Sequence, residues 1–215
     1  MEFPVCPEAF TPAVLDSLID NFLADGWAVA DSLLPPDVVG NLAAEAIGGD
    51  ALGGFHASAV GSGTSRSVVS ATRQDRICWL DPLAATIAQQ RGWDLLDALM
   101  SGLNRSLYLG LFDREAHFAI FAAGALYKPH LDCFQSGGLR VVSCILYLTE
   151  DWSETDGGAL RLFFPGGYRD IFPQPGRLVC FLSDQFYHEV RPASRRRVSL
   201  ACWFLRRSIL PVKVA

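Results

Sequence analysis

The sequence has little positive charge. It holds 18 lysines and arginines against 23 aspartates and glutamates, so its formal net charge is −5. Proteins that bind nucleic acids usually carry a basic excess, so we expect no nucleic-acid partner. Only Lys128 and Lys213 are lysines. This arginine bias, with abundant alanine and glycine, is a weak indication of a bacterial genome rich in G and C.

The sequence also lacks long apolar runs and paired-cysteine motifs. No hydrophobic stretch approaches the roughly 18 residues of a membrane-spanning helix, so we expect no membrane partner. The N-terminal residues lack the basic and apolar regions of a secretory signal. Scattered cysteines without a C-x-x-C pair indicate reduced, buried thiols, and we therefore predict a cytoplasmic protein. The cysteines are Cys6, Cys78, Cys133, Cys144, Cys180 and Cys202.

The composition favours a folded chain. Half of the residues are hydrophobic and 19% are charged, which is enough apolar material for a full core. We predict a single domain over residues 1–215. In this interpretation, residues 1–115 supply helical support and residues 116–206 form a β-rich core.

The first half of the chain has three stretches with helical spacing. They run from Thr11 to Gly26, from Pro35 to about Ile47, and from Pro82 to about Leu107 with an interruption near Gly92. Between them, residues 48–74 are rich in glycine, serine and alanine. Such a stretch is too long for a plain connection, so we expect a mobile loop over a binding site.

The second half of the chain has the two-residue period of strands. Short apolar runs alternate with glycine, proline, aspartate and serine. Helices followed by many strands predict an α+β fold with a mostly β core, either a β-sandwich or a jelly roll. The expected strands are His117–Phe121, Tyr127–Asp132, Val141–Leu148, Ala159–Phe163, Leu178–Leu182, His188–Arg191 and Val198–Phe204.

Two of the four histidines lie in a pattern typical of metal ligands. His130 and Asp132 form an H-x-D triplet, and residues i and i+2 of a strand point to the same face. His188 follows at the start of another expected strand. Two histidines and one carboxylate make the facial triad of non-haem Fe(II) enzymes, which leaves coordination positions open. The triplet alone is equally compatible with a hydrogen-bonded pair on a strand.

An arginine nine residues after His188 adds to this pattern. Arg197 shares a strand face with Ser199 and leads into an apolar strand. A guanidinium is a bidentate partner for a carboxylate, so an iron site with Arg197 nearby suits 2-oxoglutarate. The alternative, a solvated basic turn, applies better to Arg195 and Arg196.

Together these motifs resemble a known family. The chain is similar to the 2-oxoglutarate- and Fe(II)-dependent prolyl hydroxylases, in particular to bacterial relatives of the hypoxia-inducible-factor prolyl hydroxylases. The resemblance runs from about Gly26 to Phe204. Its motifs are Thr72–Trp79, Tyr127–Asp132, Arg140–Leu148, Asp151-Trp152, Gly157–Arg161 and the stretch from His188 to Arg197.

The resemblance implies a fold and a set of site residues. The fold is a double-stranded β-helix, a jelly-roll and cupin-like variant with supporting N-terminal helices. His130, Asp132 and His188 would bind Fe(II), and Arg197 and Tyr147 would hold 2-oxoglutarate. Asp75 and Arg140 would form an ion pair near the substrate, although an ordinary surface pair is the alternative. Lining residues would be Trp79, Tyr127 and Trp203, whereas His117 is expected on a face remote from the metal.

The implied activity is hydroxylation at C4 of a prolyl residue in a protein. The reaction would consume O2 and 2-oxoglutarate and release succinate and CO2, with ascorbate as a stimulant. The resemblance indicates an exposed loop proline, and elongation factor Tu is a candidate substrate. Two alternatives stay open: an oxygenase for a small molecule such as a free amino acid, and a non-enzymatic jelly-roll module.

Overall fold

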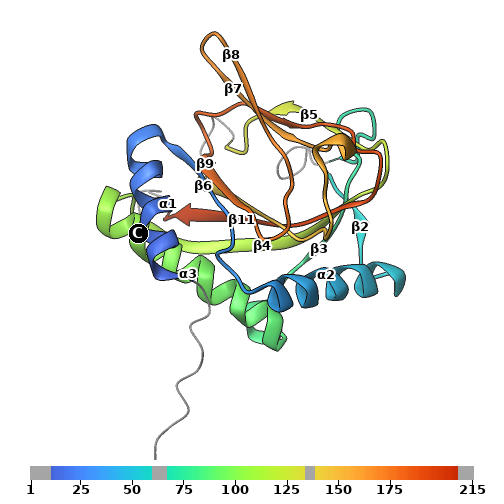
Figure 1. Ribbon diagram of the computed structural model, residues 1–215, viewed down its shortest axis with the longest axis horizontal. Coiled ribbons are helices and arrows are strands. Elements are labelled where there is room, and N and C mark those ends of the chain that lie inside the picture. Colours follow the sequence, from blue (N-terminus) through green and yellow to red (C-terminus); the bar gives the residue numbers. More distant parts are fainter. Residues whose placement is uncertain (1–10, 60–66, 134–138, 208–215) are drawn as a thin grey trace, which may run out of the picture.

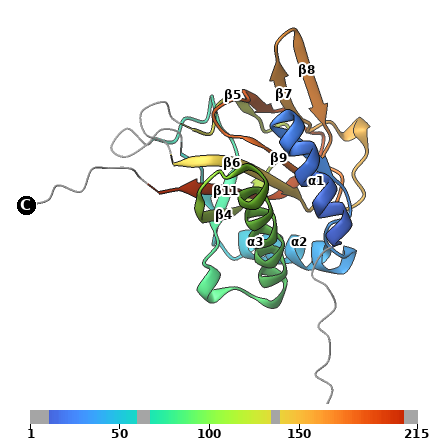
Figure 2. The same ribbon diagram turned by 90° about the vertical axis from the view of Figure 1, so that its left-hand side faces the viewer.

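A computed structural model describes residues 11–59, 67–133 and 139–207. Three helices lie on one side of a large antiparallel sheet, and a smaller sheet faces its other side (Figure 1, Figure 2). Within the described residues, no helix is long and apolar enough to cross a membrane. The helical elements are α1 (Pro12–Asp25), α2 (Pro36–Ala51), η2 (Pro82–Ala84), α3 (Ile87–Leu107) and η3 (Glu154–Asp156).

The strands form two sheets that face each other. The larger sheet has the order β1-β9-β6-β11-β4-β3-β2, and the smaller one has the order β5-β10-β7-β8. Two facing antiparallel sheets with this connectivity are the predicted double-stranded β-helix. The strands are β1 (Trp27–Ala30), β2 (His56–Ala57), β3 (Arg76–Trp79), β4 (Leu111–Phe121), β5 (Tyr127–His130), β6 (Arg140–Tyr147), β7 (Leu160–Phe164), β8 (Gly167–Ile171), β9 (Leu178–Leu182), β10 (His188–Val190) and β11 (Arg197–Arg206).

The alternation of β11 separates a core from a site. Val198, Leu200, Cys202 and Phe204 are buried among the helices on one face of the large sheet. The residues between them, from Arg197 to Trp203, point into a pocket between the two sheets. Because successive side chains of a strand face opposite ways, one strand serves both purposes.

Three cysteines form a row across the centre of the large sheet. Cys144 on β6 is directly opposite Cys202 on β11 and Cys180 on β9. All three are almost completely buried, on the helical side of the sheet. Burial raises the pKa of each thiol above its ordinary value.

The helices differ from the expectation at two places. The helix α3 is continuous through Gly92, so the predicted interruption is wrong. A glycine costs a helix about 1 kcal/mol, but this one lies in the buried face against Leu42 and Leu200, where packing decides. Gly102 has a clearer purpose: a Cβ there would come within 2.3 Å of Ile19 Cδ1, so its absence lets α1 pack closely on α3.

The segment predicted as a loop at residues 48–74 is partly regular. The helix α2 extends to Ala51, and β2 pairs with β3. Further on, Arg73 forms a bridge with Tyr127 at the start of β5. The middle of the predicted loop, residues 60–66, lies outside the described residues. Two strands, β3 and β8, are additions to the predicted set.

Candidate active site

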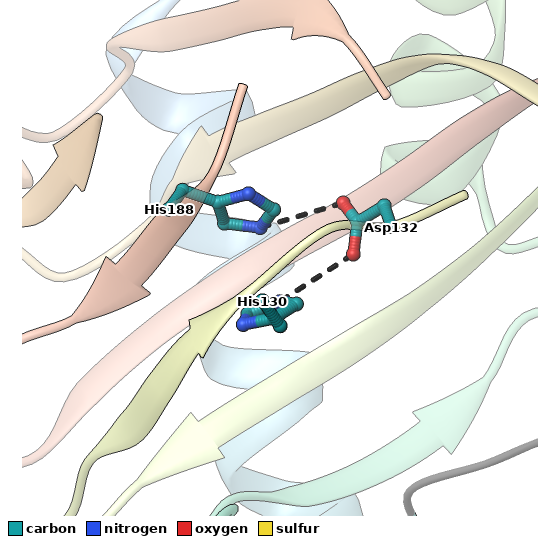
Figure 3. Close-up of side chains that lie close together, drawn as sticks. All are labelled: His130, Asp132 and His188. Carbon is teal, nitrogen blue, oxygen red and sulfur yellow. Dashed lines mark ion pairs between the residues drawn. The ribbon is translucent and has the colours of Figure 1, made fainter. Parts of the chain in front are cut away.

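The H-x-D triplet and the distant histidine meet at the edge of the small sheet. His130 on β5 is directly opposite His188 on β10, and Asp132 lies just beyond the end of β5. The carboxylate oxygens of Asp132 are 3.5 Å from Nε2 of His130 and 3.5 Å from Nε2 of His188 (Figure 3). One ligand atom from each residue lies within 4.8 Å of the others. The structure therefore brings together all three predicted metal ligands.

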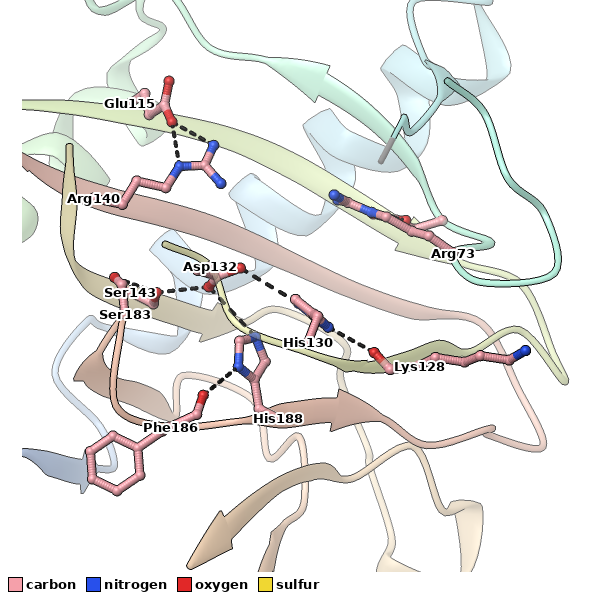
Figure 4. A network of polar contacts seen from close by, with 11 residues as sticks. Arg73, Glu115, Lys128, His130, Asp132, Arg140, Ser143, Ser183, Phe186 and His188 are labelled. Carbon is pink, nitrogen blue, oxygen red and sulfur yellow. Dashed lines mark hydrogen bonds and ion pairs between the residues drawn. The ribbon is translucent and has the colours of Figure 1, made fainter. Parts of the chain in front are cut away.

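Backbone carbonyls fix the tautomer of both histidines. Nδ1 of His130 is 2.8 Å from the carbonyl oxygen of Lys128, and Nδ1 of His188 is 3.1 Å from that of Phe186 (Figure 4). A carbonyl only accepts hydrogen bonds, so each Nδ1 carries the proton. Both Nε2 atoms keep their lone pairs and face Asp132, which is the arrangement that a metal requires.

A pair of serines supports the carboxylate, and sequence reasoning did not find it. Ser143 on β6 donates a hydrogen bond of 2.7 Å to Oδ2 of Asp132, and its hydroxyl is 2.9 Å from that of Ser183 (Figure 4). Both serines are buried polar residues in the middle of apolar stretches. That pattern was the available signal.

The charges of the triad suit a cation. Burial alone would raise the pKa of Asp132, but the neighbouring histidines outweigh it and hold the pKa well below its ordinary value. Burial, together with the proximity of His130, lowers the pKa of His188 to about 4. Near neutral pH the site therefore presents one carboxylate and at least one neutral imidazole. Two imidazole nitrogens and a carboxylate form the donor set of non-haem Fe(II) centres.

Deeper in the pocket lie a buried cation and a buried hydroxyl. Arg197 and Tyr147 are 2% and 0% exposed. Among the described residues, no partner accepts from Nε or Nη2 of Arg197 or pairs with the hydroxyl of Tyr147. Burial raises the pKa of Tyr147 although Arg197 opposes this, so the hydroxyl stays a donor. A carboxylate between these donors would satisfy all of them, which fits the far end of 2-oxoglutarate.

Aromatic rings line the pocket on the side away from Arg197. The ring centroid of His117 is 4.9 Å from that of Trp79 and 5.2 Å from that of Trp203. The prediction of a remote face for His117 is wrong, because this residue lines the same pocket as the triad. Trp79 is 39% exposed and lies at the rim, whereas Trp203 is buried.

His117 is a neutral hydrogen-bonding group in this wall. Its Nδ1 is 3.1 Å from the carbonyl oxygen of Phe118, so Nδ1 carries the proton. Burial, helped by the charge of Arg73, lowers the pKa of His117 to about 3. The ring therefore presents the acceptor Nε2 at any pH near neutrality.

The predicted ion pair between Asp75 and Arg140 is wrong in its partners. Arg73 forms a bidentate pair with Asp75, at 2.6 Å and 2.8 Å. Arg140 instead pairs with Glu115 on β4 (Figure 4). Its guanidinium also lies over the ring of Trp203, 3.7 Å from the centroid. Asp75 had a cation two residues away in the chain, and this nearer partner is the one it takes.

Tyr127 reaches the site as predicted, but through a direct contact with a metal ligand. Its ring is stacked on that of His130, with centroids 3.5 Å apart and planes at 16°. Arg73 also packs against it, with the guanidinium carbon 4.7 Å from the centroid. All the predicted site residues except Arg140 line the pocket that holds the triad or form the triad itself, apart from Trp79 at the rim and Tyr147 behind it.

Comparison with known proteins agrees with this geometry. Residues 116–205 match the 2OG-Fe(II) oxygenase superfamily. A prolyl-4-hydroxylase from Pseudomonas putida has 40% sequence identity and a TM-score of 0.80, over 90% of this chain and 100% of that one. A prolyl hydroxylase from Trichoplax adhaerens, solved with a peptide of the hypoxia-inducible-factor oxygen degradation domain, has 25% identity and a TM-score of 0.80, over 89% of each chain.

Among curated proteins, human Egl nine homolog 1 is 31% identical over 146 residues. The match covers 61% of this chain and only 33% of the human protein, so the chain spans about a third of that relative. The fold and the site define the chain as a member of the 2OG-Fe(II) oxygenase superfamily. Within that superfamily it belongs to the prolyl hydroxylases, and the predicted family and fold are both confirmed.

Proposed function

We propose that the protein is a 2-oxoglutarate- and Fe(II)-dependent prolyl 4-hydroxylase that modifies a loop proline of a protein substrate. One observation carries this proposal: a His-Asp-His triad shares a pocket with Arg197, a buried guanidinium with unsatisfied donors. The first feature suits Fe(II), and the second suits the dicarboxylate that such enzymes consume.

His130, Asp132 and His188 would hold the metal from one side. Bound there, Fe(II) supplies the redox chemistry that couples oxidation of 2-oxoglutarate by O2 to hydroxylation of a C–H bond. One oxygen atom enters the hydroxyl group and the other enters succinate, while CO2 leaves. Ascorbate would stimulate the reaction by keeping iron reduced.

The other residues of the pocket bind and orient. Arg197 and Tyr147 would donate hydrogen bonds to the far carboxylate of 2-oxoglutarate, which sets the direction in which the molecule enters. Ser143 holds the carboxylate of Asp132. The wall of Trp79, His117 and Trp203 would exclude water and pack against the prolyl ring, so that C4 faces the metal. No residue of this wall has to move a proton.

A protein substrate is supported by the relatives. The Trichoplax prolyl hydroxylase is described in complex with a peptide, and the exposed rim at Trp79 leaves one side of the pocket open. The resemblance to bacterial relatives points to a loop proline of elongation factor Tu. A cytoplasmic location and a single domain over residues 1–215 are part of the same proposal.

The test is a peptide-mass survey of the native cytosol. Extract is incubated with the protein, Fe(II), ascorbate and 2-oxoglutarate, and the matched control is Asp132→Ala, which lacks one metal ligand. We expect the mass of one oxygen atom on a specific proline, in elongation factor Tu or another protein, with the wild type only. If 2-oxoglutarate is consumed by the wild type without any such gain, the substrate is a small molecule. If neither occurs, the chain is a binding module.

A further inference from the structure

An irregular strand brings Tyr127 onto a metal ligand. His188 is opposite His130, but Val190, two residues further along β10, is opposite Tyr127, three residues back along β5. The extra residue is a bulge, which changes the faces that side chains take. Without it, residues three apart would point to opposite sides of the strand. With it, the ring of Tyr127 lies flat against the imidazole of His130.

A second segment holds Tyr127 in this place. Arg73 forms a bridge with Tyr127, and the backbone N–H of Lys128 donates to the carbonyl of Thr72 at 2.9 Å. The side chain and backbone of Gln74 make two hydrogen bonds of 3.1 Å to the backbone of Leu126. Residues 72–74 are thus attached to the start of β5.

The guanidinium of Arg73 is itself fixed. Asp75 binds it in bidentate geometry, and Ser58 donates to the carboxylate of Asp75. Asp75 is 2% exposed, so a charge that costs much to bury is spent on orienting one arginine. The arginine in turn packs against the ring of Tyr127.

We propose that Arg73 is a positioning residue for the metal ligand His130 and acts through Tyr127. The hydrogen bond at Nδ1 sets the tautomer of His130 but leaves the imidazole free to rock about that bond. The stacked tyrosine, pressed by Arg73, removes this freedom and keeps Nε2 directed at the metal position. The proposal rests on the proposed function, in which His130 binds the metal.

Electrostatics and positioning predict opposite results for the loss of Arg73. The negative charge of Asp132 is near enough to contribute to the raised pKa of Arg73. The positive charge of Arg73 therefore repels a divalent cation at the triad. If charge alone mattered, Arg73→Gln would bind metal more tightly. If Arg73 positions His130, the same substitution weakens binding.

The experiment measures the affinity of the full chain for Mn²⁺ by calorimetry. We expect Arg73→Gln to weaken binding about tenfold or more, the usual effect of residues that orient a metal ligand. The matched control is Arg114→Gln. Arg114 has the same surroundings far from the triad: a bidentate pair with Asp97 and a ring, that of Trp93, at 4.7 Å. We expect it to lower thermal stability and leave Mn²⁺ affinity within twofold.

A second pair of variants leaves the ion pair of Arg73 intact. Tyr127→Leu removes the stacked ring and is expected to weaken Mn²⁺ binding as much as Arg73→Gln. Tyr127→Phe keeps the ring and is expected to bind as the wild type does. These two variants decide the matter if Arg73→Gln fails to fold.

The outcomes separate this proposal from the proposed function. Wild-type affinity or tighter binding in both Arg73→Gln and Tyr127→Leu would overturn the role of Arg73 and leave the enzyme assignment intact. Equal weakening in Arg114→Gln would also overturn it, because the effect would then be general. Failure of the wild type to bind Mn²⁺ would contradict the metal site, and both proposals with it.

Discussion

Replacing Tyr147 by phenylalanine should stabilise the protein alone and weaken its binding of 2-oxoglutarate. The hydroxyl of Tyr147 is completely buried, and no described residue pairs with it. The ring is part of the apolar core between the two sheets, and phenylalanine keeps that ring. The substitution therefore removes one polar atom and little packing.

The two effects can be estimated separately. A buried polar group without a partner costs about 1–3 kcal/mol, and its removal should raise the free energy of unfolding by part of that amount. A hydrogen bond to a charged group contributes about 1.5–3 kcal/mol, and about 1.4 kcal/mol corresponds to a factor of ten. Tyr147→Phe should therefore weaken 2-oxoglutarate binding by about ten- to a hundredfold.

Urea unfolding of the metal-free protein measures the first effect. Titration of the Mn²⁺-loaded protein with 2-oxoglutarate measures the second, without turnover. Tyr168→Phe is the control, because Tyr168 is 58% exposed on β8 and should change neither quantity. Unchanged 2-oxoglutarate affinity in Tyr147→Phe would refute the assignment of Tyr147. Lower stability without ligand would show that its hydroxyl is satisfied in the free protein.

Three further predictions concern the surroundings of the pocket. Ser143→Ala removes the donor to Asp132 and should weaken Mn²⁺ binding about tenfold; calorimetry showing no change would contradict this. The pKa of Asp75 is lowered because Arg73 and Ser58 outweigh burial, so its stabilisation is complete above about pH 4 and is lost as pH falls through the lower folded pKa. Asp75→Asn should reduce the free energy of urea unfolding at pH 7 and flatten its fall in acid, whereas an equally steep fall would count against the ion pair. His117→Leu removes a neutral acceptor worth about 0.5–1.5 kcal/mol, so the KM of the protein substrate should rise severalfold in turnover assays while that of 2-oxoglutarate stays the same; a change confined to 2-oxoglutarate would be the opposite result.

Much of the fold could be predicted because its patterns are local. The alternation of β11 is visible in the sequence, with apolar residues at Val198, Leu200 and Cys202. The spacing of His130 and Asp132 survived even though β5 ends at His130, because the chain needs only to deliver two side chains to one point. The hairpin of β7 and β8 was missed, although Pro165-Gly166-Gly167 is a turn signal between two strands.

The partners of charged residues could not be predicted. Asp75 is drawn to whichever cation packing brings nearest, and spacing cannot rank Arg73 against Arg140. His117 was assigned to the wrong face, although counting in steps of two back from Phe121 would have placed it in the pocket. The bulge in β5 was invisible as well, because it depends on how two strands pair rather than on either sequence.

The row of Cys144, Cys180 and Cys202 gives the chain an internal reporter of sheet opening. Only a thiolate reacts readily with alkylating agents, and burial keeps these thiols protonated on the face away from the active site. The row joins three adjacent strands at their middle. Modification of these cysteines therefore proceeds only as fast as the centre of the large sheet separates from its helices. Their labelling rate measures that separation independently of any event in the pocket.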